Sequence, residues 1–212
     1  MKKDKLNKFS VPLGLLDYIN PIFYTITMVV LISNNYSIME TPYNVILLIG
    51  AIISIFFGFI IPTGKVLVGL GVIKFKMPVS LVFCVNFGIL LSGLMLLKNV
   101  MSISLGVLIT IALFIIIVLV LVYLKSKKIN TIAVLTGAFG YLLMYISLIT
   151  LAIRNNVVLP ILFYGIAILL FLMLCGIGIK ADLKNPKVHW VIEVSNVLCQ
   201  GLVALATVIL FS

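Results

Sequence analysis

The chain has 212 residues, of which 64% are hydrophobic and 9% are charged, and its mean hydropathy is +1.37. A soluble domain has roughly 45–50% apolar and about 25% charged residues, so this composition excludes a soluble globular fold and predicts an integral membrane protein. The formal net charge is +10, but the lysines form short clusters between apolar runs. That pattern is typical of membrane-topology signals, and no nucleic-acid partner is expected.

Apolar runs separated by polar residues, glycine or proline predict seven transmembrane helices, because about 20 residues cross a bilayer. Helices are expected rather than strands, since an unpaired strand edge in lipid leaves backbone groups unsatisfied. The chain is therefore predicted to be one polytopic membrane domain, an all-α seven-helix bundle. In chain order, the spans are expected near residues 12–33, 43–62, 78–97, 102–124, 130–153, 157–179 and 188–211.

The end of the second span has two interpretations, because Pro62 interrupts an apolar stretch that resumes after Lys65. In the favoured interpretation the helix ends near Pro62, and residues 66–73 lie along the membrane interface. In the alternative the helix continues to about Ile73, with a kink at Pro62. Lys65 would then lie inside the membrane, where a cation is costly and usually functional.

The loop charges predict the topology. With a cytoplasmic N-terminus and an outer C-terminus, 13 of the 15 basic residues lie on the inner side, and only Lys98 and Arg154 lie outside beside Glu40. This asymmetry follows the positive-inside rule. The composition, rich in lysine, asparagine and isoleucine, favours the plasma membrane of a bacterium.

The two ends of the chain share a faint order of Asn-Asn, Pro, Gly, Lys, Pro and Asn, which suggests that spans one to three are repeated as spans five to seven. Span four would then be a connector in a 3+1+3 parallel repeat. In this inferred architecture alone, the chain resembles the vitamin-type nicotinamide riboside transporters, and that resemblance implies transport. The aromatic-rich substrate motifs expected of those transporters are absent from a chain with one tryptophan.

The last span carries the clearest polar pattern. Its polar residues fall on one narrow stripe of a helix at about 100° per residue, and such a stripe must face protein or water. The stripe consists of His189, Glu193, Asn196, Gln200 and Thr207.

The first and third spans present matching polar residues. Asp17, Asn20 and Tyr24 share one face of the first helix, at a depth similar to that of Glu193. Asn86 in the third span adds a further wall, with Gly93 allowing close approach. The predicted substrate-binding residues are therefore Asp17, Asn20, Tyr24, Asn86, His189, Glu193, Asn196 and Gln200.

Two interpretations of this constellation stay open. In the functional one, Asp17 or Glu193 titrates in a cavity and couples protons or binds a cation, while the amides bind a solute. In the structural one, both carboxylates pair with Lys8, Lys184 or Lys187, and the amides join helices through bonds that contribute about 0.6–2 kcal/mol.

Three classes of function fit this sequence. A small-solute transporter or permease, with a polar pocket opening towards the cytoplasm, is the leading prediction. The alternatives are a non-catalytic sensor, immunity or accessory subunit, and an intramembrane enzyme that acts on a lipid. No cofactor or metal is predicted, because one histidine excludes HExxH and multi-histidine sites and no P-loop or dinucleotide motif is present. The expected partners are the lipid bilayer, a small solute, and a second copy or a membrane partner subunit.

Overall fold

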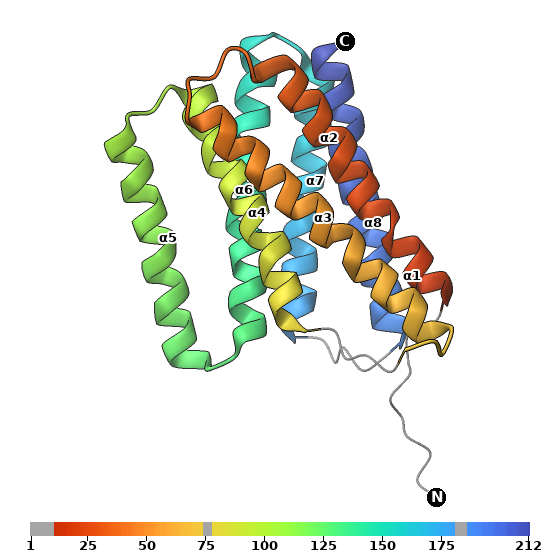
Figure 1. Cartoon of the computed structure of the whole chain (residues 1–212). Helices are drawn as coiled ribbons and strands as arrows, with labels where there is room; N and C mark the ends of the chain where they lie inside the picture. Colours follow the sequence, from red (N-terminus) through yellow and green to blue (C-terminus); the bar gives the residue numbers. More distant parts are fainter. Residues whose placement is uncertain (1–10, 74–77, 181–185) are drawn as a thin grey trace, which may run out of the picture.

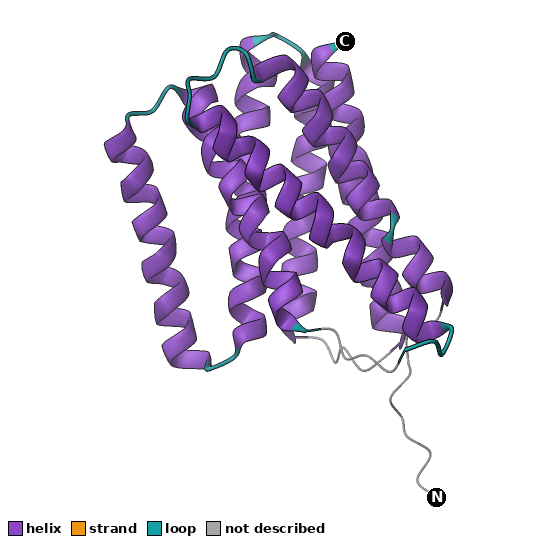
Figure 2. Cartoon of the chain, in the orientation of Figure 1, coloured by secondary structure: helices purple, strands orange, loops and turns teal. Residues whose placement is uncertain are grey.

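The structure is a computed structural model that describes residues 11–73, 78–180 and 186–212. Every regular element in these residues is a helix (Figure 2). The elements are α1 (Val11–Asp17), α2 (Ile19–Asn35), α3 (Tyr43–Gly69), α4 (Val79–Met101), α5 (Leu105–Ser126), α6 (Ile129–Arg154), α7 (Val158–Lys180) and α8 (Pro186–Phe211).

Seven helical segments in these residues are long and apolar enough to cross a membrane, counting α1 and α2 together as one segment from Val11 to Asn35. The predicted all-α fold with seven helices able to span a membrane is thus confirmed among the described residues. Six of the predicted spans agree with the helices to within a few residues at each end.

The favoured end of the second span is wrong. Helix α3 continues through Pro62 to Gly69, so residues 63–69 extend the helix by almost two turns beyond the proline. Proline removes the hydrogen bond to the carbonyl four residues earlier and crowds it, and here that carbonyl belongs to Gly58. The alternative interpretation was closer, although the helix ends before Ile73.

The first span is divided between α1 and α2 at Tyr18. Pro21 has no N–H group, so the carbonyl of Asp17, four residues earlier, loses its helical donor. At the same turn, the Tyr18 N–H donates to the Leu15 carbonyl, only three residues earlier, at 3.2 Å. The proline thus places the helix break beside the carboxylate of Asp17.

Helix α4 is at the centre of the bundle, where it packs against α3 and most extensively against α6. Helix α8 packs against α7, α2 and α1. Helix α5 lies at the periphery, where it contacts α6 and the edge of α4 (Figure 1). Most of its large side chains are exposed, as expected of a helix surrounded by lipid.

Glycines allow α4 to approach both of its neighbours. A Cβ atom on Gly88 would lie 2.6 Å from the Gly50 carbonyl oxygen of α3, and one on Gly140 of α6 would lie 2.6 Å from the Leu90 nitrogen. Small residues at such crossings replace the hydrophobic driving force that is missing between helices in lipid. These crossings fix the walls of the site described next.

The two ends of the bundle differ in charge. Helix α1 begins at the same end as the turn between α5 and α6, which carries Lys125, Lys127 and Lys128, and Ser212 lies at the opposite end (Figure 1). The end with the three lysines is called the basic end below.

Candidate functional site

Three charged side chains meet inside the bundle near the basic end. The Lys65 Nζ atom of α3 lies 2.7 Å from Asp17 Oδ2 of α1 and 2.8 Å from Glu193 Oε1 of α8. The three side chains are 14%, 11% and 9% exposed. One ammonium therefore bridges two carboxylates, and the three formal charges sum to −1 when all are ionised.

Asn20 completes this charged cluster from α2. Its Nδ2 donates to Asp17 Oδ1 at 3.2 Å and is 3.4 Å from Glu193 Oε2. Because ionised carboxylates only accept hydrogen bonds, this contact fixes the amide orientation and turns Asn20 Oδ1 away from the cluster. The second oxygen of each carboxylate is thus held by the same amide group.

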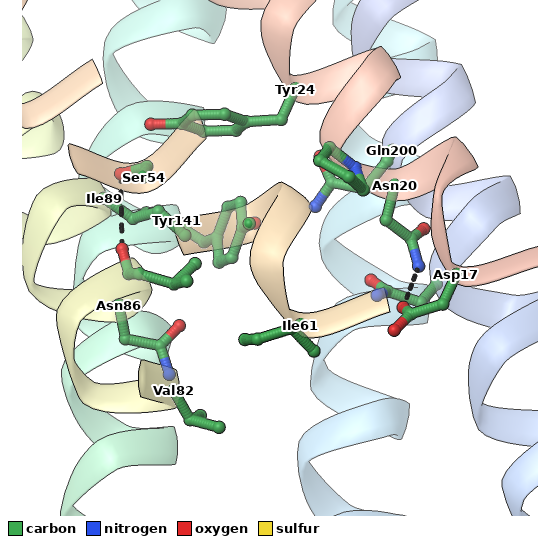
Figure 3. Close-up of a pocket in the computed structure, with 14 residues that line it drawn as sticks. Asp17, Asn20, Tyr24, Ser54, Ile61, Val82, Asn86, Ile89, Tyr141 and Gln200 are labelled. Carbon is green, nitrogen blue, oxygen red and sulfur yellow. Dashed lines mark hydrogen bonds between the residues drawn. The ribbon is translucent and has the colours of Figure 1, made fainter. Parts of the chain in front are cut away.

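A cavity of about 230 Å³ lies next to the charged cluster. Figure 3 shows Asp17, Asn20 and Gln200 on one side of it, and Val82, Asn86 and Ile89 of α4 on the other. Its lining comes from α1, α2, α3, α4, α6 and α8. The lining residues are Asp17, Asn20, Pro21, Tyr24, Ser54, Gly58, Ile61, Val82, Val85, Asn86, Ile89, Tyr141, Asn196 and Gln200.

Apart from Asp17 Oδ2, which is ion-paired with Lys65, three buried polar atoms on cavity-lining residues have no hydrogen-bond partner among the described residues: Asn20 Oδ1, Tyr24 Oη and Gln200 Oε1. The three side chains are 8%, 4% and 3% exposed. A buried unpaired acceptor costs about 1–3 kcal/mol, and most such groups in proteins have a partner or a bound molecule. The wall of the cavity therefore contains buried polar atoms that lack protein partners.

The cavity occupies the half of the bundle nearest the basic end. On α4 its lining runs from Val82, about one turn into the helix, to Ile89, about 10 Å further along at 1.5 Å per residue. Beyond it the interior is filled by apolar side chains that are at most 1% exposed, among them Met28, Leu47 and Leu148. The lining thus stops short of the far end of the bundle.

Six of the eight predicted site residues line this single cavity: Asp17, Asn20, Tyr24, Asn86, Asn196 and Gln200. Glu193 belongs to the charged cluster but not to the cavity lining. His189, one turn before Glu193 on α8, is half-buried and also lies outside the lining. The polar residues of spans one, three and seven are thus brought together as the sequence predicted, with His189 at the margin.

Some of these polar groups also join helices, as the structural interpretation predicted. Asn86 Nδ2 of α4 donates to the Ala133 carbonyl of α6 at 2.8 Å. Thr207, at the far end of the α8 stripe, lies 3.0 Å from Tyr164 Oη of α7. The stripe therefore faces the cavity near the basic end and packs against α7 beyond it.

The predicted pairing of the carboxylates was incomplete. Both pair with Lys65, which no predicted pairing included. Lys8 and Lys184 lie outside the described residues, as does the side chain of Lys187. The sequence held a signal for Lys65, because two carboxylates facing the interior of a bundle call for a cation at similar depth.

Two further wall residues, Ser54 and Tyr141, were not among the predicted site residues. Ser54 Oγ of α3 donates to the Gly50 carbonyl at 2.8 Å and lies 3.2 Å from the Val85 carbonyl of α4. Tyr141 lies on α6 and lines the same cavity. Its ring centroid lies 6.5 Å from that of Tyr24, edge to face, so two phenol rings border the cavity.

The arrangement offers no metal site among the described residues, where no group of three or more His, Cys, Asp or Glu side chains comes together. Comparison with known protein families, with curated proteins and with solved structures gives no match.

Proposed function

We propose that this multi-pass membrane protein is a small-solute transporter whose binding site is the cavity beside the Asp17–Lys65–Glu193 cluster. The observation that carries the proposal is the cavity itself, walled by five of the seven spans and lined by buried polar atoms that lack partners. A bundle stabilised only by packing gains nothing from such atoms, because each costs about 1–3 kcal/mol. A solute that enters the cavity removes that cost.

The proposed orientation places the basic end in the cytoplasm. Lys125, Lys127 and Lys128 lie at that end, and short loops rich in lysine remain on the cytoplasmic side of a membrane. The cavity then lies in the cytoplasmic half of the bundle, and the apolar interior around Leu47 and Leu148 closes the outer half. This is the form expected of an inward-facing state in alternating access.

The helix packing supports the 3+1+3 repeat as part of this proposal. Let the first half be α1–α2, α3 and α4, and the second half α6, α7 and α8. If the two halves are exchanged, the α3–α4 contact corresponds to the α7–α8 contact, and the α2–α3 contact corresponds to the α6–α7 contact. The α4–α6 contact corresponds to the α2–α8 contact. All six contacts are present. Only α5 has no counterpart, in keeping with a connector.

In this pseudo-two-fold arrangement, the cavity lies where the two halves meet. Its lining comes from both halves, with most residues from the first half and Tyr141, Asn196 and Gln200 from the second. Transporters built from two repeats bind their solute between the halves and move one half against the other. A cavity at this junction is where a solute would be passed across.

The test is uptake by proteoliposomes that contain the full chain. The vesicles are incubated with a defined mixture of amines, amino acids, sugars, nucleosides and carboxylates, and their contents are measured by mass spectrometry. The proposal predicts saturable accumulation of at least one solute class. Substitution Asn196→Phe, which fills the cavity from α8, is expected to reduce that uptake at least tenfold.

The matched control is Leu198→Phe on the same helix. Leu198 is 57% exposed and faces away from the cavity, so this variant is expected to transport at the wild-type rate. Uptake no greater than in empty vesicles, or uptake equal in Asn196→Phe and wild type, would overturn the transport proposal. Co-purification with a partner protein in the absence of flux would favour an accessory subunit instead.

A further inference from the structure

The unpartnered atoms of the cavity share one chemical property. Asn20 Oδ1 and Gln200 Oε1 are carbonyl oxygens that only accept hydrogen bonds, and Tyr24 Oη can accept one as well. A ligand that satisfies them must therefore carry N–H or O–H donors. A carboxylate has no such donor at neutral pH and would leave these oxygens unpaired.

The net charge of the cluster further limits the chemical class of the ligand. Asp17 and Glu193 share the single ammonium of Lys65, so the cluster holds one more carboxylate than cation. Asp17 also lines the cavity, whereas Lys65 does not. A solute in the cavity thus lies against Asp17 rather than against Lys65, and the excess negative charge of the ionised cluster disfavours an anion there.

The opposite wall of the cavity is mostly apolar. In Figure 3, Val82 and Ile89 lie across the cavity from Asp17, Asn20 and Gln200, with Ile61 between the two sides. Asn86, also on that wall, uses its amide nitrogen for the Ala133 carbonyl. The cavity is therefore amphipathic, with an oxygen-lined side on α1, α2 and α8 and an aliphatic side on α4.

The volume of the cavity and its two tyrosine rings also limit the size and charge of the ligand. The cavity volume of about 230 Å³ is below the range of roughly 300–1,000 Å³ that holds drug-sized ligands. The rings of Tyr24 and Tyr141 border it, and the faces of such rings attract ammonium groups within about 6 Å. A cation of a few carbon atoms fits both features.

The geometry points to a small amphipathic amine, in its protonated form, as the ligand of this cavity. Its ammonium donates to Asp17, Asn20 Oδ1 and Gln200 Oε1, and its hydrocarbon part packs against Val82 and Ile89. Lys65 holds the same two carboxylates with a side chain of the same chemical kind, an alkylammonium. This inference deepens the proposed function by naming its substrate class, and it rests on that function only for passage across the membrane.

The test is equilibrium binding, measured by calorimetry and by the thermal unfolding midpoint of the full chain in detergent. The probes are ethyl-, butyl- and hexylammonium chloride, with 1-butanol, sodium butyrate and sodium chloride as comparisons at equal ionic strength. At least one alkylammonium is expected to bind saturably and to raise the unfolding midpoint, while the three comparison compounds do neither.

Substitutions of cavity-lining residues test whether the alkylammonium binds in the cavity. Asp17→Asn removes the carboxylate, and Gln200→Met removes an unpaired carbonyl while keeping the length of the side chain; each is expected to weaken alkylammonium binding at least tenfold. Gln200→Met keeps the test valid should Asp17→Asn fail to fold. The matched control is Glu40→Gln, which removes a carboxylate from the exposed segment before α3 and is expected to leave binding unchanged.

Several results would overturn the inference. These are the absence of saturable binding by every alkylammonium, equal binding of 1-butanol, equal stabilisation by sodium chloride, or unchanged affinity in Gln200→Met. Binding without uptake would overturn transport and leave the ligand class standing. Uptake of another solute that alkylammonium does not inhibit would overturn the ligand class and leave transport standing.

Discussion

Lys65 Nζ on α3 lies 2.8 Å from Glu193 Oε1 on α8, although 128 positions separate the two residues in the chain. The same ammonium reaches Asp17 on α1 at 2.7 Å. One side chain therefore fastens three spans together beside the cavity. Because the cluster is almost fully enclosed, its three charges depend on one another far more than charges at a protein surface do.

Removing the ammonium is expected to be strongly destabilising. Lys65→Met leaves two carboxylates close together and without their cation, and breaking a buried pair in this way costs about 3–5 kcal/mol. A large fall in the thermal unfolding midpoint in detergent, or loss of folded protein, is the predicted result. Lys125→Met, at the exposed end of α5, is the control and should unfold like the wild type.

Neutralising the partners as well should reverse most of that loss. The triple variant Lys65→Met, Asp17→Asn, Glu193→Gln contains no buried charge, so its unfolding midpoint should lie closer to that of the wild type than the midpoint of Lys65→Met does. Should the triple variant be less stable than the single one, charge pairing would not explain the cluster.

Asn86 is expected to contribute a modest amount to stability through its bond to the Ala133 carbonyl. Asn86→Ala removes an interhelical hydrogen bond, and such bonds average about 0.6 kcal/mol with a maximum near 1.7. The free energy of unfolding should fall by an amount in that range. Asn34→Ala is a suitable comparison, because Asn34 is exposed and bonds only to its own helix at the Val30 carbonyl; equal losses in the two variants would argue against an interhelical role.

The crossing of α4 and α6 should tolerate no added side chain. Gly140→Val places a Cβ atom where the Leu90 backbone nitrogen is only 2.6 Å away, so the helices must separate, at a cost of about 1–3 kcal/mol or more. Gly176 of α7 has nothing within 4 Å of its Cβ position, and Gly176→Val is the matched control. A lower unfolding midpoint is expected in the first variant alone.

The proposed orientation is tested with reporters of location. A reporter fused after Ser212 should be active only on the outer side of the membrane, and one inserted at Lys127 only in the cytoplasm. Reporters that appear on the same side would remove one span from the bundle, and exchanged sides would place the cavity in the outer half.

Much of the fold could be predicted because it depends on hydrophobicity alone. Runs of about 20 apolar residues identify membrane helices whatever their neighbours are. The end of α3 could not be predicted in this way, since a proline ends many helices but α3 continues past Pro62. The break at Tyr18 also depends on a local detail, the missing N–H of Pro21.

Helical periodicity alone predicted part of the site. The stripe from Glu193 to Gln200 and the face from Asp17 to Tyr24 both follow from the angle between residues on a helix, and both meet the cavity. The pairing of Lys65 with these faces depends on which helices become neighbours, and periodicity carries no information on that. Ser54 was missed because a single serine in an apolar helix usually bonds its own backbone, as it also does here.

Cysteine accessibility shows whether a water-filled solute cavity lies beside the charged cluster in the cytoplasmic half of the bundle, as we propose. In a chain whose Cys84, Cys175 and Cys199 are replaced by alanine, Asn196→Cys should react with a membrane-impermeant cationic thiol reagent added from the cytoplasmic side. Leu198→Cys, on the lipid-facing side of the same helix, should not react. An unreactive cysteine at position 196, from either side of the membrane, would contradict the account.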